Sequence, residues 1–220
     1  MSVDRPEAAA PIDALGAIGI IPVVVIDDAG HAAPLAEALL AGGIAGAEVT
    51  LRTPAAFGAL AVMARYPGFT AGAGTVLNPE QVAAVADAGA QYAVSPGFDP
   101  DVVAACLGRS LPVLPGAVTA TEIQQVRRAG LRACKFFPAE AAGGLRTLSA
   151  LAAPFPDMRF VPTGGIGPEN AAGYLAAPFV LAVGGTWMVT RELIADGRWD
   201  RIRELAAQAA ALAAGRQRSR

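Results

Sequence analysis

The residue with the clearest chemical potential in this sequence is Lys135, which lies in the largely apolar stretch 131–138. It is the only lysine in 220 residues, and every other residue among the 17 Lys and Arg is arginine. An arginine keeps its proton near neutral pH, whereas a lysine in surroundings that lower its pKa becomes a neutral amine that attacks carbonyl carbon. We therefore predict that Lys135 forms a Schiff base with a carbonyl substrate. The alternative interpretation is a lysine that forms an ion pair or extends its ammonium group to solvent.

A second set of polar residues alternates with apolar ones in and after the run 47–51. Side chains of a β-strand point alternately to its two faces, so Glu48, Thr50 and Arg52 share one face. The apolar face is expected to pack against helices, which turns the polar face toward the interior of the fold. Charged groups there are costly unless they are paired or bind a ligand. The pattern thus predicts either a ligand site or an internal salt bridge between Glu48 and Arg52.

The same alternation separates Lys135 from its neighbour Cys134. Cys134 is expected to point to the opposite face, where a thiol is a buried apolar side chain rather than a nucleophile. Cys106 forms no CxxC pair or metal-binding pattern with it, so we expect two reduced thiols in a cytoplasmic protein. The single histidine, His31, lies in a polar turn and supports neither a zinc site nor a Ser-His-Asp triad.

Two glycine-rich turns follow late apolar runs, at Thr163-Gly164-Gly165 and at Gly184-Gly185-Thr186. Glycine pairs allow backbone N–H groups to approach an anion closely. In a barrel of alternating strands and helices, the turns after strands seven and eight frequently bind phosphate. We therefore predict a phosphate site here, and the alternative is that these glycines only form turns.

The elements that must position these residues follow a repeating order, in which a short apolar run precedes an alanine-rich helical segment. The predicted strands are 19–26, 47–51, 70–74, 92–95, 113–115, 131–136, 159–163 and 180–184. Helices are predicted near 34–42, 54–65, 79–88, 100–107, 119–129, 145–153, 168–176 and 189–195, with a last helix over 199–214. This order is typical of an α/β fold that forms a single (β/α)8 TIM barrel over residues 1–220, with an extra C-terminal helix and a loose N-terminal arm at 1–12. A doubly wound open sheet is the rival, and the first predicted strand is not followed by the G-x-G-x-x-G that would support it.

Composition and charge exclude several classes of protein. Hydrophobic residues make up 54% of the chain and charged residues 16%, which excludes a disordered chain. The net charge of -2 offers no basic surface for nucleic acid. No apolar run reaches the roughly 18 residues of a membrane span, and the apolar run 17–26 lacks the basic region of a signal peptide.

Taken together, these residues resemble the 2-keto-3-deoxy-6-phosphogluconate (KDPG) / 4-hydroxy-2-oxoglutarate (KHG) aldolase family, which are small class I aldolases of the (β/α)8 fold. The first family signature is matched by Gly43-Ile44 and Glu48-Val49-Thr50-Leu51-Arg52, and the second by Gly130, Lys135-Phe136-Phe137-Pro138-Ala139 and Gly143. Further similar blocks are Ile21-Pro22-Val23, Gly72-Ala73-Gly74-Thr75, Ser95-Pro96-Gly97, Pro162-Thr163-Gly164-Gly165 and Gly184-Gly185-Thr186. The likeness extends over residues 14–205. Cys134 replaces a usual aliphatic residue, and Thr186 replaces a common serine.

The resemblance implies a role for each matching residue. Lys135 would form the Schiff base with the C2 ketone, and Glu48 would be the general acid/base, acting through a water. The pyruvate carboxylate and neighbouring oxygens would be held by Arg52, Thr75 and Thr163, and the pocket would be shaped by Pro96 and Phe137. The phosphate would be held by Gly164, Gly165, Gly184, Gly185 and Thr186.

The resemblance also implies an activity. The family cleaves KDPG to pyruvate and glyceraldehyde 3-phosphate, and cleaves 4-hydroxy-2-oxoglutarate to pyruvate and glyoxylate. It needs no metal and no cofactor, and it is typically homotrimeric. The epimeric substrate derived from galactonate stays open. A non-catalytic sugar-phosphate-binding barrel is disfavoured because both Glu48 and Lys135 are present. A barrel isomerase or epimerase would need a carboxylate or histidine pair and no imine-forming lysine.

Overall fold

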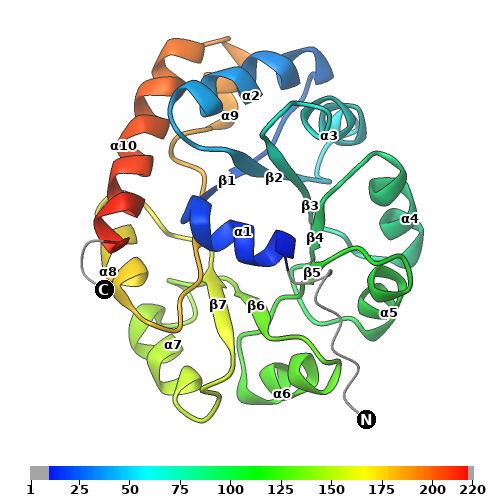
Figure 1. Cartoon of the computed structure of the whole chain (residues 1–220), viewed down its shortest axis with the longest axis vertical. Coiled ribbons are helices and arrows are strands. Elements are labelled where there is room, and N and C mark those ends of the chain that lie inside the picture. The colour runs from blue at the N-terminus through cyan, green and yellow to red at the C-terminus, as the bar shows by residue number, and fades with distance from the viewer. Residues whose placement is uncertain (1–9, 218–220) are drawn as a thin grey trace.

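Parallel strands alternate with helices along the chain in the computed structural model, which describes residues 10–217 (Figure 1). The eight strands in this range are β1 (Ile20–Val24), β2 (Gly46–Thr50), β3 (Thr70–Gly74), β4 (Tyr92–Val94), β5 (Val113–Leu114), β6 (Ala133–Phe136), β7 (Arg159–Pro162) and β8 (Val183–Gly185). The helices are α1 (Ala10–Ile18), η2 (Ala29–His31), α2 (Ala32–Ala41), α3 (Ala56–Met63), α4 (Pro79–Asp87), α5 (Pro100–Gly108), α6 (Ala120–Arg128), α7 (Gly144–Ala152), α8 (Ala171–Ala176), α9 (Arg191–Ala195) and α10 (Trp199–Gln217). The predicted order of elements is therefore observed, with boundaries shifted by a few residues.

The strands form two curled parallel sheets. The larger sheet has the order β5-β4-β3-β2-β1-β8, and β6 pairs with β7 in the smaller one. Isolated parallel bridges, Gly116–Lys135 and Thr163–Gly184, connect the two sheets. The α/β class is confirmed, whereas a complete (β/α)8 barrel stays a prediction.

Helix boundaries follow from local capping chemistry. The Asn78 side chain accepts a hydrogen bond from the backbone of α4, and Asp99 does the same for α5. A proline stands in the first turn of both helices, where its missing N–H costs little. Helix α6 begins with a capping box between Thr119 and Glu122. These short-range signals explain why the predicted helix starts agree with the structure.

Helix α1 was not predicted, because residues 1–12 were expected to be a loose arm. Residues 1–9 lie outside the described part of the chain, and α1 begins at Ala10. The helix runs across the end of the fold where the strands begin (Figure 1). Leu15 is only 1% exposed and packs in an inner cluster with Ile21, Tyr92 and Leu114. Helix α1 therefore closes the end of the strands that lies opposite the predicted site.

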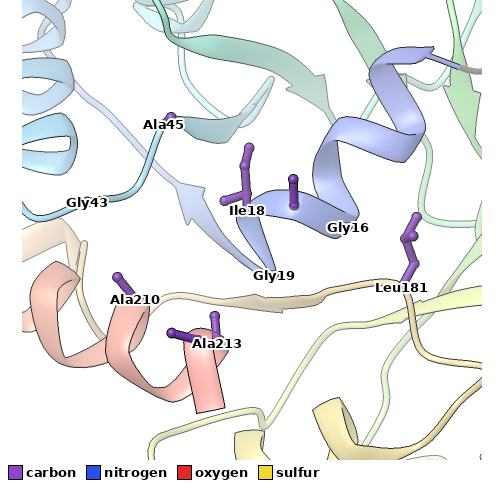
Figure 2. Close-up of a pocket in the computed structure, with 10 residues that line it drawn as sticks. Gly16, Ile18, Gly19, Gly43, Ala45, Leu181, Ala210 and Ala213 are labelled. Carbon is purple, nitrogen blue, oxygen red and sulfur yellow. The ribbon is translucent and has the colours of Figure 1, made fainter. Parts of the chain in front are cut away.

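A cavity of about 530 Å³ lies beside α1 at this same end (Figure 2). Its lining consists of Gly16, Ala17, Ile18, Gly19, Gly43, Ala45, Leu181, Ala210, Ala213 and Ala214. This lining carries no titratable side chain, so the cavity offers no group for acid–base or covalent chemistry.

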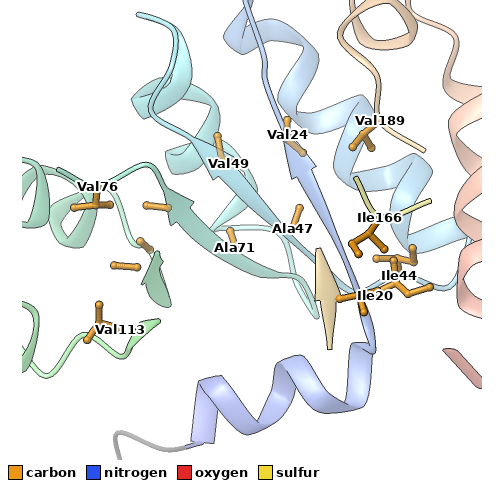
Figure 3. Packing of buried hydrophobic residues seen from close by; sticks show 14 of the residues in the cluster. Ile20, Val24, Ile44, Ala47, Val49, Ala71, Val76, Val113, Ile166 and Val189 are labelled. Atoms are coloured by element: carbon orange, nitrogen blue, oxygen red, sulfur yellow. The ribbon is translucent and has the colours of Figure 1, made fainter. Parts of the chain in front are cut away.

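The main hydrophobic core lies between the strands and the surrounding helices, and Figure 3 shows part of it. Val49 and Ala47 of β2 are fully buried in this core, as the alternation predicted. Helix α10 confirms the predicted C-terminal helix and packs against α2 and α8. No helix within residues 10–217 is long and apolar enough to cross a membrane.

Candidate active site

Lys135 and Glu48 meet inside the fold, although 86 residues separate them in the sequence. The Lys135 Nζ atom lies 3.0 Å from Glu48 Oε1 and 3.4 Å from Oε2. Lys135 is 7% exposed and Glu48 is 4% exposed. A buried ion pair of this kind is retained only where its geometry is good or where it has a function, because removing two charges from water costs several kcal/mol. Nζ also lies 5.3 Å from the centre of the ring of Phe137, which is the first residue after β6.

The inner face of β3 provides the room that Glu48 occupies. Glu48 pairs in register with Gly72, which pairs in turn with Tyr92 on β4. A Cβ atom at Gly74 would lie 2.2 Å from Glu48 Oε1, and one at Gly72 would lie 2.1 Å from the Tyr92 ring. The two glycines therefore let the side chains of β2 and β4 extend over β3.

Tyr92 is a site neighbour that sequence reasoning missed. Its ring is 1% exposed, and its hydroxyl donates a hydrogen bond of 3.1 Å to the carbonyl of Ala47, beside Glu48. Burial, and then the charge of Glu48, raise the pKa of Tyr92 well above its usual value. Tyr92 thus stays protonated near Glu48. The alternating glycines at 72 and 74 were the signal that a large neighbour could fill this space.

The predicted alternative of an internal Glu48–Arg52 salt bridge is wrong, because Glu48 pairs with Lys135. Arg52 lies beyond the end of β2 and is exposed. Within the described residues, its guanidinium group has no hydrogen bond or ion pair. Arg191, at the start of α9, forms an ion pair with Asp27 after β1, and these hydrogen bonds lower the pKa of Asp27. Arg52 thus differs from Arg191 in having no carboxylate partner at this end of the strands.

The three threonines near the pair are held differently. Thr50 donates to the carbonyl of Val24 at 2.8 Å, which commits its hydroxyl to the backbone. Thr163 is 6% exposed and makes a long contact of 3.4 Å with the carbonyl of Val161. Thr75, directly after β3, has a φ of 60°, which is an uncommon backbone conformation for a residue other than glycine. Strained residues of this kind cluster at functional sites.

The remaining predicted pocket residues line the same end of the strands. Phe137 is 37% exposed beside Lys135. Pro96, after β4, is exposed, and its carbonyl would lie 2.0 Å from a Cβ atom at Gly116. Cys134 is fully buried on the opposite face of β6, and burial raises the pKa of its thiol far above the usual range.

The two predicted phosphate turns lie next to each other. The bridge between Thr163 and Gly184 joins the ends of β7 and β8, and a Cβ atom at Gly184 would lie 2.4 Å from Thr163 Oγ1. Gly164 and Gly165 have φ values of 99° and 76°, which strongly favour glycine. Gly185 lies against the Trp187 ring, and Thr186 is exposed. The structure therefore brings these turns to the end of the strands at which Lys135 and Phe137 lie.

Comparison with known proteins relates this site to described enzymes. Residues 12–205 match the family described as KDPG and KHG aldolase. The chain is 46% identical over 191 residues to the KHG/KDPG aldolase of Escherichia coli strain K12, and the match covers 86% of this chain and 90% of that protein.

Two solved structures are also similar. One is the KDPG aldolase from Legionella pneumophila with pyruvate captured at low pH as a covalent carbinolamine intermediate. It is 43% identical with a TM-score of 0.84, and the match covers 87% of this chain and 96% of that one. The other is the 2-keto-3-deoxy-6-phosphogluconate aldolase of Zymomonas mobilis ZM4 with 3-phosphoglycerate. It is 41% identical with a TM-score of 0.85, covering 91% of this chain and 95% of that one.

Proposed function

This chain belongs to the KDPG and KHG aldolase family, a family of carbon–carbon lyases, and from that premise we propose that it cleaves KDPG to pyruvate and glyceraldehyde 3-phosphate. The observation that carries the proposal is the buried contact of 3.0 Å between Lys135 Nζ and Glu48 Oε1. It joins a candidate nucleophile to a candidate proton acceptor in one water-poor space. The relative from Escherichia coli, named for both substrates, supports 4-hydroxy-2-oxoglutarate as a second substrate.

In the proposed mechanism, Glu48 accepts a proton from the Lys135 ammonium group, and the neutral amine attacks the C2 ketone. Return of the proton to the departing oxygen releases water and leaves a protonated imine. Glu48 then takes the proton of the C4 hydroxyl as the C3–C4 bond breaks. The electron pair of that bond flows to the imine nitrogen, which gives an enamine and the aldehyde. Delivery of the proton to C3 forms the pyruvate imine, which water hydrolyses.

Binding roles are proposed for the residues around this pair. Arg52, whose guanidinium has no partner within the described residues, is suited to the substrate carboxylate, together with Thr75 and Thr163. Pro96 and Phe137 border the pocket. The Gly164-Gly165 turn is suited to the phosphate, since its positive-φ glycines present backbone N–H groups to an anion. Gly184, Gly185 and Thr186 lie beside this turn, at the end of β8. The relative from Zymomonas mobilis, which was solved with 3-phosphoglycerate, supports the binding of a three-carbon phosphate.

The test is reductive trapping. Incubation with pyruvate and borohydride, followed by mass mapping, is expected to give one adduct on Lys135. Lys135→Ala and Lys135→Arg should both lose turnover, the second because a guanidinium stays protonated. Turnover that survives in Lys135→Ala, or an adduct at the α-amine instead, would contradict the mechanism.

Three finer features belong to the same proposal. We propose that the two curled sheets form one closed (β/α)8 barrel, that the enzyme is a cytoplasmic homotrimer, and that residues 1–220 act as a single domain. The bridges between the sheets support closure, while trimerisation follows from the family resemblance. Light scattering of the purified chain tests the trimer, and a monomer would contradict it. Parallel assays of KDPG and its galactonate-derived epimer test the stereochemical preference.

A further inference from the structure

We propose that Glu140 and Asn170, with Tyr174 behind Glu140, hold the Gly164-Gly165 turn in the conformation that binds phosphate. They are positioning residues and do not need to touch the substrate. The inference rests on the phosphate site of the proposed function and goes beyond it, because it identifies what sets the preference for a phosphorylated substrate. We refer to Glu140, Asn170 and Tyr174 as the turn brace.

Asn170 ties the two ends of the turn together. Its side-chain Nδ2 donates to the carbonyl of Gly165 at 2.9 Å, and its Oδ1 accepts from the N–H of Gly167 at 2.9 Å. One amide therefore satisfies a carbonyl and an N–H that lie two residues apart. Asn170 stands directly before α8, so this contact anchors the turn to the start of a helix.

Glu140 holds the other side of the turn. Its backbone N–H donates to the carbonyl of Gly164 at 3.0 Å, and a Cβ atom at Gly165 would lie 2.7 Å from Glu140 Cβ. The Glu140 carboxylate accepts a hydrogen bond from the hydroxyl of Tyr174, which is 2% exposed in α8. Burial, and then Glu140 itself, raise the pKa of Tyr174, so that its hydroxyl remains a donor at neutral pH.

These contacts engage both carbonyl oxygens of the glycine pair. A carbonyl oxygen that pointed at a phosphate dianion would repel it. A hydrogen bond to each carbonyl from a donor outside the turn fixes the orientation of the peptide plane and keeps the oxygen engaged. Within residues 10–217, the N–H groups of Gly164 and Gly165 donate to no protein group, so they remain available to an anion. The turn brace thus engages the two carbonyl oxygens of Gly164 and Gly165, and the two N–H groups of the same glycines stay free to bind an anion.

The brace also connects the phosphate turn to the lysine. Glu140 follows Lys135 by five residues, and the backbone of Ala139 donates to the carbonyl of Thr163 at 2.8 Å. A Cβ atom at Gly164 would lie 3.3 Å from Pro138 Cα. The phosphate turn therefore packs directly against the segment that follows Lys135.

The experiment compares two substrates in the full-length chain, KDPG and 4-hydroxy-2-oxoglutarate. Asn170→Ala and Glu140→Ala should each raise KM for KDPG about tenfold, which is the effect of losing roughly one hydrogen bond. Values of kcat/KM for 4-hydroxy-2-oxoglutarate should stay within about twofold of wild type, since it carries no phosphate. Glu140→Gln should restore near wild-type KM, because its amide oxygen still accepts from Tyr174.

Matched controls come from the opposite end of the strands. Tyr66→Phe removes a similar tyrosine–glutamate hydrogen bond to Glu37, and Gln91→Ala removes an amide that accepts from the backbone of Ala71. Neither should change the ratio of kcat/KM for the two substrates. An unchanged ratio in both Asn170→Ala and Glu140→Ala, or an equal loss for both substrates, would overturn the brace. Failure of the proposed function is recognised separately, because the wild-type chain would then form no Lys135 adduct with pyruvate or show no preference for KDPG.

Discussion

Gly74 of β3 lies against the carboxylate of Glu48, and an added Cβ atom would come within 2.2 Å of Oε1 and 2.6 Å of Cγ. Two residues from different strands thus occupy adjoining space inside the fold. Glu48 can reach Lys135 only because position 74 carries no side chain. A glycine on β3 therefore helps to position Glu48, the proposed general acid/base.

Gly74→Ala is expected to displace the Glu48 carboxylate and to lower kcat by about 10- to 100-fold, a part of what a positioned acid–base group contributes. Steady-state kinetics with KDPG measures this. Gly108→Ala in α5 is the matched control, because a Cβ atom there meets nothing within 4 Å. A Gly74→Ala variant with full activity would show that the site accommodates the methyl group.

Glu48→Gln keeps the shape of the side chain but cannot carry a proton. We expect kcat to fall by roughly 10²- to 10⁴-fold, while pyruvate still forms a borohydride-trapped adduct on Lys135. Glu37→Gln on the exposed face of α2 serves as the control. If Glu48→Gln turned over at the wild-type rate, Glu48 would be only the structural partner of the lysine.

The buried pair also makes a prediction about stability. Lys135→Met leaves the Glu48 charge without its partner, which should lower the free energy of unfolding by about 3–5 kcal/mol. The double variant Lys135→Met/Glu48→Gln removes both charges and should recover most of that loss. Urea denaturation of the two variants and wild type measures the difference, and equal stability of the single and double variants would argue against a tight interaction.

Gly164→Asp places a side chain and a negative charge at the proposed phosphate turn. KM for KDPG should rise by about tenfold or more, whereas cleavage of 4-hydroxy-2-oxoglutarate should change little. Gly130→Asp is the matched control for backbone strain, since Gly130 also has a positive φ, of 84°, and lies at the other end of β6. A wild-type ratio of kcat/KM values in a folded Gly164→Asp variant would place the phosphate elsewhere.

Both cysteines are expected to resist alkylation in the native protein. Burial raises the pKa of Cys106 to about 11 and disfavours the thiolate of Cys134 further. At pH 8 about one part in a thousand of Cys106 is then thiolate, against roughly a tenth in the unfolded chain, where the thiol has its ordinary pKa of 9.0. The raised pKa values keep both thiols protonated, and so resistant to alkylation, at neutral pH. Above the unfolded thiol pKa of 9.0, the unfolded chain loses these protons more readily than the folded one, so the free energy of unfolding falls as the pH rises. Iodoacetamide at pH 8 should modify both thiols in urea, and rapid modification without urea would contradict the burial.

Much of this protein was predictable from local signals. The period-2 alternation around Glu48 and the isolation of Lys135 among arginines indicate two candidate active-site residues, and the structure brings their side chains together. Caps such as Asn78 and Asp99, each followed by proline, explain why helices α4 and α5 were predicted correctly. These signals act over a few residues, so the sequence itself displays them.

Other features were decided only when distant segments met. Glu48 was paired with Arg52 in one prediction because the two are neighbours on a strand, yet its partner is Lys135 on another sheet. Helix α1 had no strong local signal, and its Leu15 is buried only because the ends of the strands form an apolar surface beneath it. The role of Gly74 likewise depends on a side chain from β2. Distances between strands arise from the register and curl of the whole sheet, which no single stretch of sequence encodes, and so the tertiary structure alone determined which charges, glycines and rings lie in contact.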